Sequence, residues 1–161
     1  MSSSQDQPGG IRIHVDADAC PVKDEVYKVA LRHEVPVNVV ANSFMRVPQH
    51  RLFTRVTVPE APDVADDWIA ERANAACVVI TSDMLLAQRC LEAGARVLAP
   101  NGKPFTENSI GQAVATRAIM EDLRATGEQT SGPKAFRPAD RSNFLSALEV
   151  EMQKLKRRAR P

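Results

Sequence analysis

The spacing of hydrophobic residues changes along the chain. Segments with the spacing of a β-strand take turns with segments that have the spacing of a helix. Short alternating segments such as residues 11–15, and continuous apolar runs such as residues 77–80, are typical of β-strands. Between them, apolar residues recur every three or four positions, which is typical of helices with one buried face. The pattern predicts strands at residues 11–15, 37–41, 52–58, 77–80 and 96–99. It predicts helices at residues 21–33, 64–76, 84–93 and 106–126, and a last helix that begins at Asp140 or Ser142.

This order of elements predicts the fold class. Strands that alternate with helices indicate an α/β protein with three layers (α/β/α), in which a mostly parallel central sheet lies between helices. The continuous apolar run at residues 77–80 fits a strand that is covered on both faces. A length of 161 residues suits one domain. We expect a disordered arm at residues 1–10, the α/β domain at residues 11–150, and a basic helix end and tail at residues 151–161.

Composition narrows the classes of function. The net charge is only +1, so any affinity for nucleic acid has to come from local basic patches. No apolar run is long enough to cross a membrane, and the polar first ten residues do not resemble a secretory signal. The three cysteines, Cys20, Cys77 and Cys90, are odd in number and lack the CxxC spacing of zinc sites. We therefore expect a cytoplasmic protein without a membrane partner, in which Cys77 and Cys90 pack in the core.

Acidic residues stand where strands of the predicted sheet end, and at the start of one helix. In parallel α/β sheets, ligands bind beyond the carboxyl ends of the strands, so side chains at these positions are expected to share a site. Neighbouring carboxylates raise one another's pKa, and a hard divalent cation such as Mg²⁺ or Mn²⁺ relieves that conflict. No histidine or cysteine accompanies them, which argues against zinc, copper and iron. The acids are Asp16, Asp18, Asp63, Asp66, Asp67 and Asp83.

Each acid also has a purely structural interpretation. Asp18, Asp63 and Asp83 can each cap a helix that begins just after them, and acids in a first helical turn complement the helix dipole. Asp63, Asp66 and Asp67, however, share one helix face, where like charges repel. Three acids there exceed what capping requires. Their joint placement with the acids at the strand ends favours a metal site.

Three of these segments resemble the acidic motifs of PIN-like nuclease domains. They are Val15-Asp16-Ala17-Asp18, Asp66-Asp67-Trp68-Ile69 and Val79-Ile80-Thr81-Ser82-Asp83, and their order and spacing agree with that family. The chain is closer still to the YaiI/YqxD family of bacterial proteins. The matching motifs are Asp16-Ala17-Asp18-Ala19-Cys20-Pro21, Asp63-Val64-Ala65-Asp66-Asp67-Trp68-Ile69, Thr81-Ser82-Asp83-Met84-Leu85-Leu86-Ala87, Gly132-Pro133-Lys134 and Asp140-Arg141-Ser142-Asn143-Phe144. The resemblance implies a PIN-like fold. It also implies that Asp16, Asp66 and Asp83 are the metal-binding and catalytic acids, supported by Asp18, Asp63 and Asp67.

The expected function is hydrolysis of a phosphodiester, with Mg²⁺ or Mn²⁺ as cofactor and RNA as partner. Lys134, Arg137 and Arg141, in or beside the polar segment 127–139, are candidates to bind the substrate phosphate, although this segment can equally be a solvated connection. One alternative is a non-catalytic RNA- or protein-binding module on the same fold. Another is a phosphatase of the DxD type, which Asp16-Ala17-Asp18 also resembles. That class has its Asp-Asp pair after the lysine, whereas Asp66-Asp67 precede Lys103 here.

Overall fold

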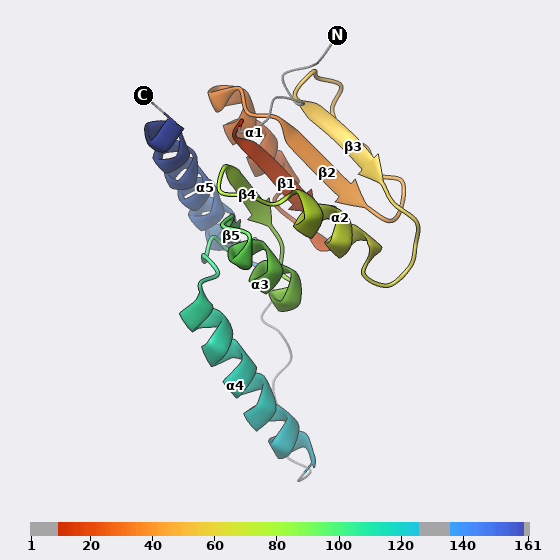
Figure 1. Ribbon diagram of the computed structural model, residues 1–161, viewed down its shortest axis with the longest axis vertical. Coiled ribbons are helices and arrows are strands. Elements are labelled where there is room, and N and C mark those ends of the chain that lie inside the picture. Colours follow the sequence, from red (N-terminus) through yellow and green to blue (C-terminus); the bar gives the residue numbers. More distant parts are fainter. Residues whose placement is uncertain (1–9, 126–135, 160–161) are drawn as a thin grey trace.

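A five-stranded parallel sheet forms the centre of the molecule. The computed structural model describes residues 10–125 and 136–159, apart from the side chains of residues 19 and 117–125. The strands lie in the order β3-β2-β1-β4-β5, and every neighbouring pair is parallel (Figure 1). This arrangement confirms the predicted three-layer α/β/α class. The strands are β1 (Arg12–Asp16), β2 (Val37–Ala41), β3 (Phe53–Thr57), β4 (Cys77–Ile80) and β5 (Arg96–Leu98).

Helices cover both faces of the sheet and enclose two hydrophobic cores. The first core lies between the sheet and helices α1 and α5, and the second between the sheet and helices α2 and α3. Val78 and Ile80 face the first core, whereas Cys77 and Val79 face the second, which explains why β4 is apolar at every position. The helices are α1 (Lys23–His33), α2 (Val64–Arg72), α3 (Met84–Glu92), α4 (Glu107–Ala125) and α5 (Pro138–Ala159), with a short 3-10 helix, η2 (Ala17–Ala19), after β1.

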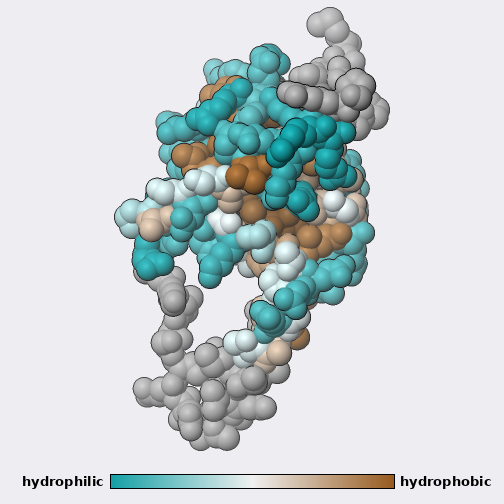
Figure 2. Space-filling model, turned by 90° about the vertical axis from the view of Figure 1, so that its left-hand side faces the viewer, coloured by the Kyte–Doolittle hydropathy of each residue, from teal (hydrophilic) through white to brown (hydrophobic). Residues whose placement is uncertain are grey.

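Helix α4 differs from the other helices because it extends away from the body of the molecule (Figure 1). It packs against the second core through Ile110, while residues 111–116 are exposed. Thr106 caps it as predicted: the Thr106 hydroxyl accepts from the Ser109 amide at 3.0 Å, and the Ser109 hydroxyl accepts from the Thr106 amide at 2.8 Å. The side of the molecule that carries α5 is mostly hydrophilic, with hydrophobic residues gathered near its middle (Figure 2).

Three predicted helix boundaries were wrong. Pro21 lies in a turn, and α1 begins only at Lys23. Helix α2 ends at Arg72 rather than Ala76, because the segment after it turns back to enter β4. Helix α5 begins at Pro138, before the predicted cap: the Asp140 carboxylate accepts a hydrogen bond from the Arg137 amide at 2.9 Å, so Asp140 caps the helix from within its first turn. The expected arm lies outside the described residues except for residue 10, and so do residue 126 and residues 127–135 of the polar segment.

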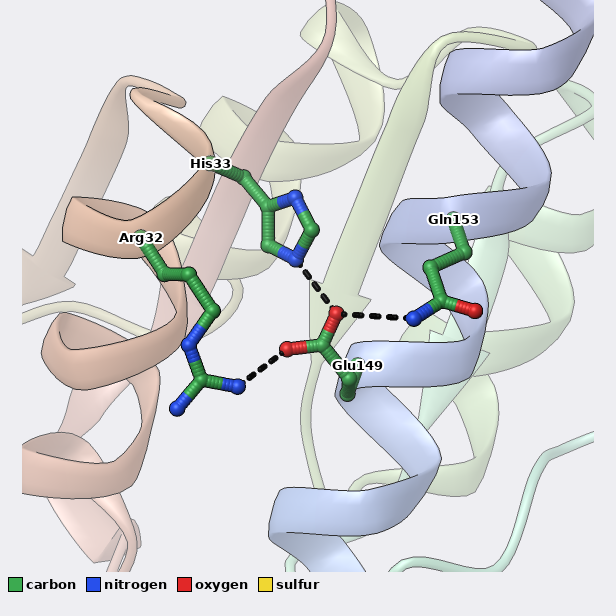
Figure 3. Close-up of polar contacts among 4 residues, drawn as sticks. All are labelled: Arg32, His33, Glu149 and Gln153. Atoms are coloured by element: carbon green, nitrogen blue, oxygen red, sulfur yellow. Dashed lines mark hydrogen bonds and ion pairs between the residues drawn. The ribbon is translucent and has the colours of Figure 1, made fainter.

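An ionic contact joins the carboxyl end of α1 to the middle of α5, and we call it the α1–α5 seam (Figure 3). Glu149 accepts hydrogen bonds from Arg32 at 2.6 Å and from Gln153 at 3.3 Å, and its other close partner is His33 at 2.5 Å. Burial by itself raises the pKa of Glu149, but the hydrogen bonds from His33 and Arg32 outweigh it and lower that pKa. The carboxylate is therefore stabilised in its charged form.

The remaining expectations concern the cysteines and membrane insertion. Cys77 and Cys90 are fully buried in the second core, which confirms their predicted packing role, and Cys20 is buried in the first core. Within residues 10–125 and 136–159, no helix is both long and apolar enough to cross a bilayer.

Candidate functional site

The carboxyl ends of β1 and β4 define the position of the site. After β1 the chain builds β2 and β3 on one side of that strand, and it then returns to place β4 and β5 on the other side. The strand order therefore reverses between β1 and β4, and such a switch point opens a crevice beyond the strand ends. Asp16 is the last residue of β1, and Asp83 lies three positions after the end of β4.

Five of the six predicted aspartates line one open cleft of about 490 Å³ at this switch point. They come from separate parts of the fold: the end of β1, helix η2, the start of α2, and the turn between β4 and α3. None of the described residues that line this cleft is basic. We call it the acid cleft. Its aspartates are Asp16, Asp18, Asp63, Asp66 and Asp83, and its other polar side chains are Asn42 and Ser82.

A short chain of hydrogen bonds positions the acids at the two strand ends. The Asp83 amide donates to the Thr81 hydroxyl at 3.0 Å, and that hydroxyl donates to Asp16 Oδ2 at 2.8 Å. Thr81 is buried, so its hydroxyl is held in place by these two partners. Thr81 therefore connects Asp16 to the turn that carries Asp83.

Asp83 has both of the roles considered for it from the sequence. Its Oδ1 accepts from the amides of Leu85 at 2.8 Å and Leu86 at 3.1 Å, so it caps α3. Both bonds use the same oxygen, and capping therefore leaves Oδ2 for the cleft that Asp83 also lines.

Asp18 and Asp63 do not cap helices with their side chains. Asp18 accepts from the Asn42 amide at 3.0 Å, which fixes helix η2 to the end of β2. Asp63 occupies the N-cap position of α2, but its side chain makes no capping hydrogen bond, and its φ of 65° is in the left-handed region. A left-handed conformation is uncommon for residues other than glycine, although aspartate adopts it more readily than most. The predicted capping roles of these two acids are therefore wrong.

Burial first, and then the crowding of carboxylates, raises the pKa of two acids of the cleft. Burial raises the pKa of Asp66 to about 6, with further contributions from Asp83, Asp16 and Asp63 that the Arg89 guanidinium only partly offsets. Burial also raises the pKa of Asp16, reinforced by Asp83 and Asp18 and opposed by the hydrogen bond from Thr81. The site therefore holds more negative charge than its surroundings compensate, which is the condition that a bound cation would relieve.

The donor atoms of the cleft fit a hard cation. All five acids offer oxygen ligands, which Mg²⁺ and Mn²⁺ prefer. Among the described residues, no three histidine, cysteine, aspartate or glutamate side chains are arranged as a ready metal-binding group. Mg²⁺ usually keeps several waters and takes only one or two carboxylates, so the cleft suits a hydrated ion and not an all-protein cage.

The other predicted site residues lie elsewhere. Asp67 does not line the acid cleft, and its carboxylate pairs with Arg89 at 2.8 Å. Arg141 donates to the Pro21 carbonyl at 2.6 Å and to Glu25 at 3.1 Å, so it ties α5 to the start of α1. Arg137 lines a second pocket beside the cleft. Lys134 lies outside the described residues.

Three polar residues of the site were missed by reasoning from the sequence. Asn42 directly follows β2, so the strand-end rule that identified Asp16 also applies to it. Thr81 and Ser82 follow β4 in the same way, but their short side chains gave no signal apart from the motif in which they stand. Hydroxyl and amide side chains at the carboxyl ends of strands are therefore site candidates in the same way as carboxylates.

Comparison with known proteins identifies the family. The sequence model of a family described as "Uncharacterized BCR, YaiI/YqxD family" matches residues 14–154. The chain belongs to this family. Its relatives include the UPF0178 protein bll3966 of Bradyrhizobium diazoefficiens, which is 61% identical over 91% of this chain and 88% of the relative. A UPF0178 protein of Sphingopyxis alaskensis is 61% identical over 90% of this chain and 95% of the relative. No solved structure matches the chain significantly.

The family match confirms the resemblance to the YaiI/YqxD family. All six predicted aspartates lie within the matched residues 14–154, and so do Lys134, Arg137 and Arg141. The acid cleft is therefore part of the family's shared region and not an addition to it.

Proposed function

We propose that this YaiI/YqxD-family protein hydrolyses phosphodiester bonds of RNA with the help of Mg²⁺ or Mn²⁺ held at the acid cleft. The observation that carries the proposal is the convergence of five aspartates, from four separate segments, on one open cleft at the switch point of the sheet. Open α/β sheets bind ligands there. The likeness of the motifs to PIN-like nuclease domains supports the same reaction.

Each residue of the cleft has a distinct part in this proposal. Asp16, Asp66 and Asp83 bind the ion or ions, and Asp18 and Asp63 line the rest of the cleft. A bound divalent ion would polarise the phosphate and lower the pKa of a water molecule that attacks it. Thr81 orients Asp16 through its 2.8 Å hydrogen bond, and the capping bonds of Asp83 keep that side chain in one rotamer.

A second function is favoured by one observation. Because the described residues contain no ready metal-binding group, a protein that binds RNA without cutting it is the competing proposal. In that case the acids of the cleft would not require an ion. Metal-dependent cleavage separates the two proposals directly.

The decisive experiment measures Mn²⁺-dependent cleavage of a short single-stranded RNA, with binding followed in parallel. Asp16→Asn removes a charged ligand without changing the size of the side chain. We expect it to slow cleavage by at least ~100-fold, because even outer-shell partners of metal ligands contribute about 10–100-fold. The matched control is Asp24→Asn, which removes the same charge from an exposed position on α1 and should cleave normally. A wild type that binds this RNA and leaves it intact with Mn²⁺ overturns the hydrolysis proposal in favour of the binding module.

A further inference from the structure

A second pocket adjoins the acid cleft and differs from it in charge. This pocket has a volume of about 290 Å³ and shares Ser82 with the cleft, so the two are neighbours at the carboxyl edge of the sheet. Its far side is formed by the turn after β5 and by the start of α5. We call it the basic pocket, and the side chains that matter here are Lys103, Phe136, Arg137 and Asp140.

The charges of the basic pocket are suited to a phosphate. Among the described residues, no carboxylate lies within ion-pair distance of Lys103, whose side chain is exposed. The Arg137 side chain is 69% exposed, and its nearest carboxylate, Asp140, is 3.9 Å away. Asp140 Oδ2 accepts from the Arg137 amide, and its other oxygen, Oδ1, makes only this long ion pair with the guanidinium. Lys103, which has no carboxylate partner among the described residues, and Arg137, which has only a long one, can therefore meet an anion from solvent, beside a cleft whose described lining contains no cation.

The frame of the basic pocket is rigid before any ligand arrives. The turn after β5 is closed by hydrogen bonds from the Ala99 amide to the Lys103 carbonyl and from the Gly102 amide to the Ala99 carbonyl, each 2.9 Å. Gly102, with φ of 88°, presses against α5: a Cβ there would lie 2.6 Å from the Asn143 carbonyl. The turn and helix α5 are thus locked together, and a preorganised site loses less entropy when it binds.

Phe136 supplies an aromatic surface on the wall of the pocket. Its ring is 36% exposed although it is a large hydrophobic side chain. The guanidinium of Arg141 lies 5.1 Å from the ring centroid and is itself held by Pro21 and Glu25, so the ring is supported from one side. Exposed aromatic rings beside cations are the surfaces on which single-stranded nucleic acids stack their bases.

We infer, resting on the hydrolysis proposed above, that the basic pocket binds the nucleotide next to the scissile phosphate and selects single-stranded RNA. Phe136 stacks on the base, while Lys103 and Arg137 bind a backbone phosphate. A base that stacks on a side chain has to be unpaired, because a base inside a duplex is already stacked between its neighbours. The acid cleft then receives the adjoining phosphodiester, and Ser82 marks the boundary between the two subsites.

The test is binding of adenosine 5′-monophosphate, measured by isothermal titration or NMR in EDTA so that no metal takes part. We expect the nucleotide to bind more tightly than either inorganic phosphate or adenosine. Lys103→Ala and Arg137→Ala should each weaken it by at least about 5-fold. Phe136→Leu should weaken it about 10-fold, within the range known for loss of one stacked base. The control is Lys28→Ala, which removes an exposed lysine of α1 and should bind normally.

Two results would overturn the inference. One is binding of inorganic phosphate as tight as that of the nucleotide and unaffected by Phe136→Leu, which would reduce the pocket to an anion site. The other is no binding of the nucleotide at all. A comparison of single-stranded RNA with the matched duplex adds an independent reading, because equal binding of the two contradicts selection for unpaired bases.

The nucleotide pocket and the proposed hydrolysis can be rejected independently of each other. If the wild type cleaves RNA but Phe136→Leu cleaves it with unchanged KM, the pocket assignment is wrong and the hydrolysis stands. If the wild type never cleaves but nucleotide binding follows the expected pattern, the hydrolysis is wrong and the nucleotide pocket stands. Thermal melts of every variant distinguish a loss of binding from a loss of folding.

Discussion

The acid cleft and the α1–α5 seam both concentrate ionisable side chains, but they treat charge in opposite ways. In the seam, one carboxylate, Glu149, meets Arg32, His33 and Gln153, and its pKa is lowered (Figure 3). In the cleft, five carboxylates meet without a basic side chain in the lining, and the pKa of Asp66 rises to about 6, through burial first and then through Asp83, Asp16 and Asp63.

This difference separates a structural role from a functional one. A carboxylate with a lowered pKa stabilises the folded state at neutral pH, whereas one with a raised pKa destabilises it there. The seam is therefore explained by folding alone, since it joins two helices that cover the same face of the sheet. The acid cleft works against folding, and local rules are typically broken in this way where a protein has a site to maintain.

The largest effect expected is at the contact between α5 and the turn after β5, which lies outside the seam and the cleft and depends on packing, not on charge. Gly102→Ala should destabilise the fold by about 3 kcal/mol, since it combines a strained positive φ with a clash against the Asn143 backbone. Urea denaturation measures this. The control is Gly111→Ala in α4, where nothing lies within 4 Å of an added Cβ, and which should instead gain about 0.5–1 kcal/mol. If Gly102→Ala leaves the free energy of unfolding unchanged, α5 does not pack against the turn after β5.

The next effect is stabilisation by metal, which should occur at the cleft and not at the seam. Mn²⁺ at about 100 times its dissociation constant should add about 2.7 kcal/mol to the free energy of unfolding. The gain should be larger at pH 7.5 than at pH 5, because protons compete with the ion for Asp66 below its pKa of about 6. Thermal shift assays measure it. Asp66→Asn should lose most of the gain and Glu149→Gln should keep it; equal gains in both variants would contradict a metal site in the cleft.

Without metal, Asp66→Asn and Glu149→Gln should change the free energy of unfolding in opposite directions. At pH 7, Asp66→Asn should stabilise the fold by about 1 kcal/mol, a value that allows for the solvent screening of a partly exposed carboxyl. Glu149→Gln should destabilise it by about 1 kcal/mol, because a charged hydrogen-bond acceptor is lost.

The pH dependence of the two variants follows from the direction of each pKa shift. In the wild type, the raised pKa of Asp66 makes stability fall as the pH rises from about 4 to about 6, and Asp66→Asn should remove that fall. The contribution of Glu149 is present above its ordinary pKa and is lost as the pH falls through its lowered value, so Glu149→Gln should cost little in strong acid. Denaturation at a series of pH values checks both expectations. If the two variants change the free energy of unfolding in the same direction at pH 7, the contrast between cleft and seam is wrong.

The smallest effect concerns Thr81, which links the acids at the two strand ends. Thr81→Val keeps the shape of the side chain but removes the hydrogen bond to Asp16, so the pKa of Asp16 should rise further. NMR titration of the Asp16 carboxyl measures this. Thr81→Ser retains the hydroxyl and should restore the wild-type value. An unchanged pKa in Thr81→Val would mean that Thr81 does not orient Asp16.

Much of the fold could be predicted from the sequence because most of its elements are half-buried or fully buried. The spacing of apolar residues reports burial directly, and so residues 37–41 and 77–80 were placed without error. The end of α2 could not be placed in this way, since Ala73 and Ala76 continue the helical spacing. The helix ends before them because the Asn74 side chain accepts a hydrogen bond from the Ala76 amide at 2.8 Å, which turns the chain into β4.

Within the site, residue spacing was informative where a residue follows a strand and uninformative along a helix, where only the motif resemblance favoured Asp66 over Asp67. The carboxyl end of a parallel strand always points to the same edge of the sheet, so Asp16 and Asp83 were expected to approach one another. Asp66 and Asp67 are neighbours in α2, and successive helical residues point about 100° apart. Which of them faces the cleft depends on how α2 is rotated on the sheet, and the contacts of Ile69 with the core decide this.

The sequence by itself therefore determined the order and type of the elements, the two-sided burial of β4, the family, and the acids at the strand ends. Only the tertiary structure decided that Asp67 pairs with Arg89 outside the cleft, and that Lys103 joins Arg137 in a pocket beside the acids. It also decided that Arg141 is occupied by Pro21, 120 positions earlier in the chain. The physical reason is the same each time: the partner of a charged side chain is set by the packing of distant segments, and local spacing carries no record of that packing.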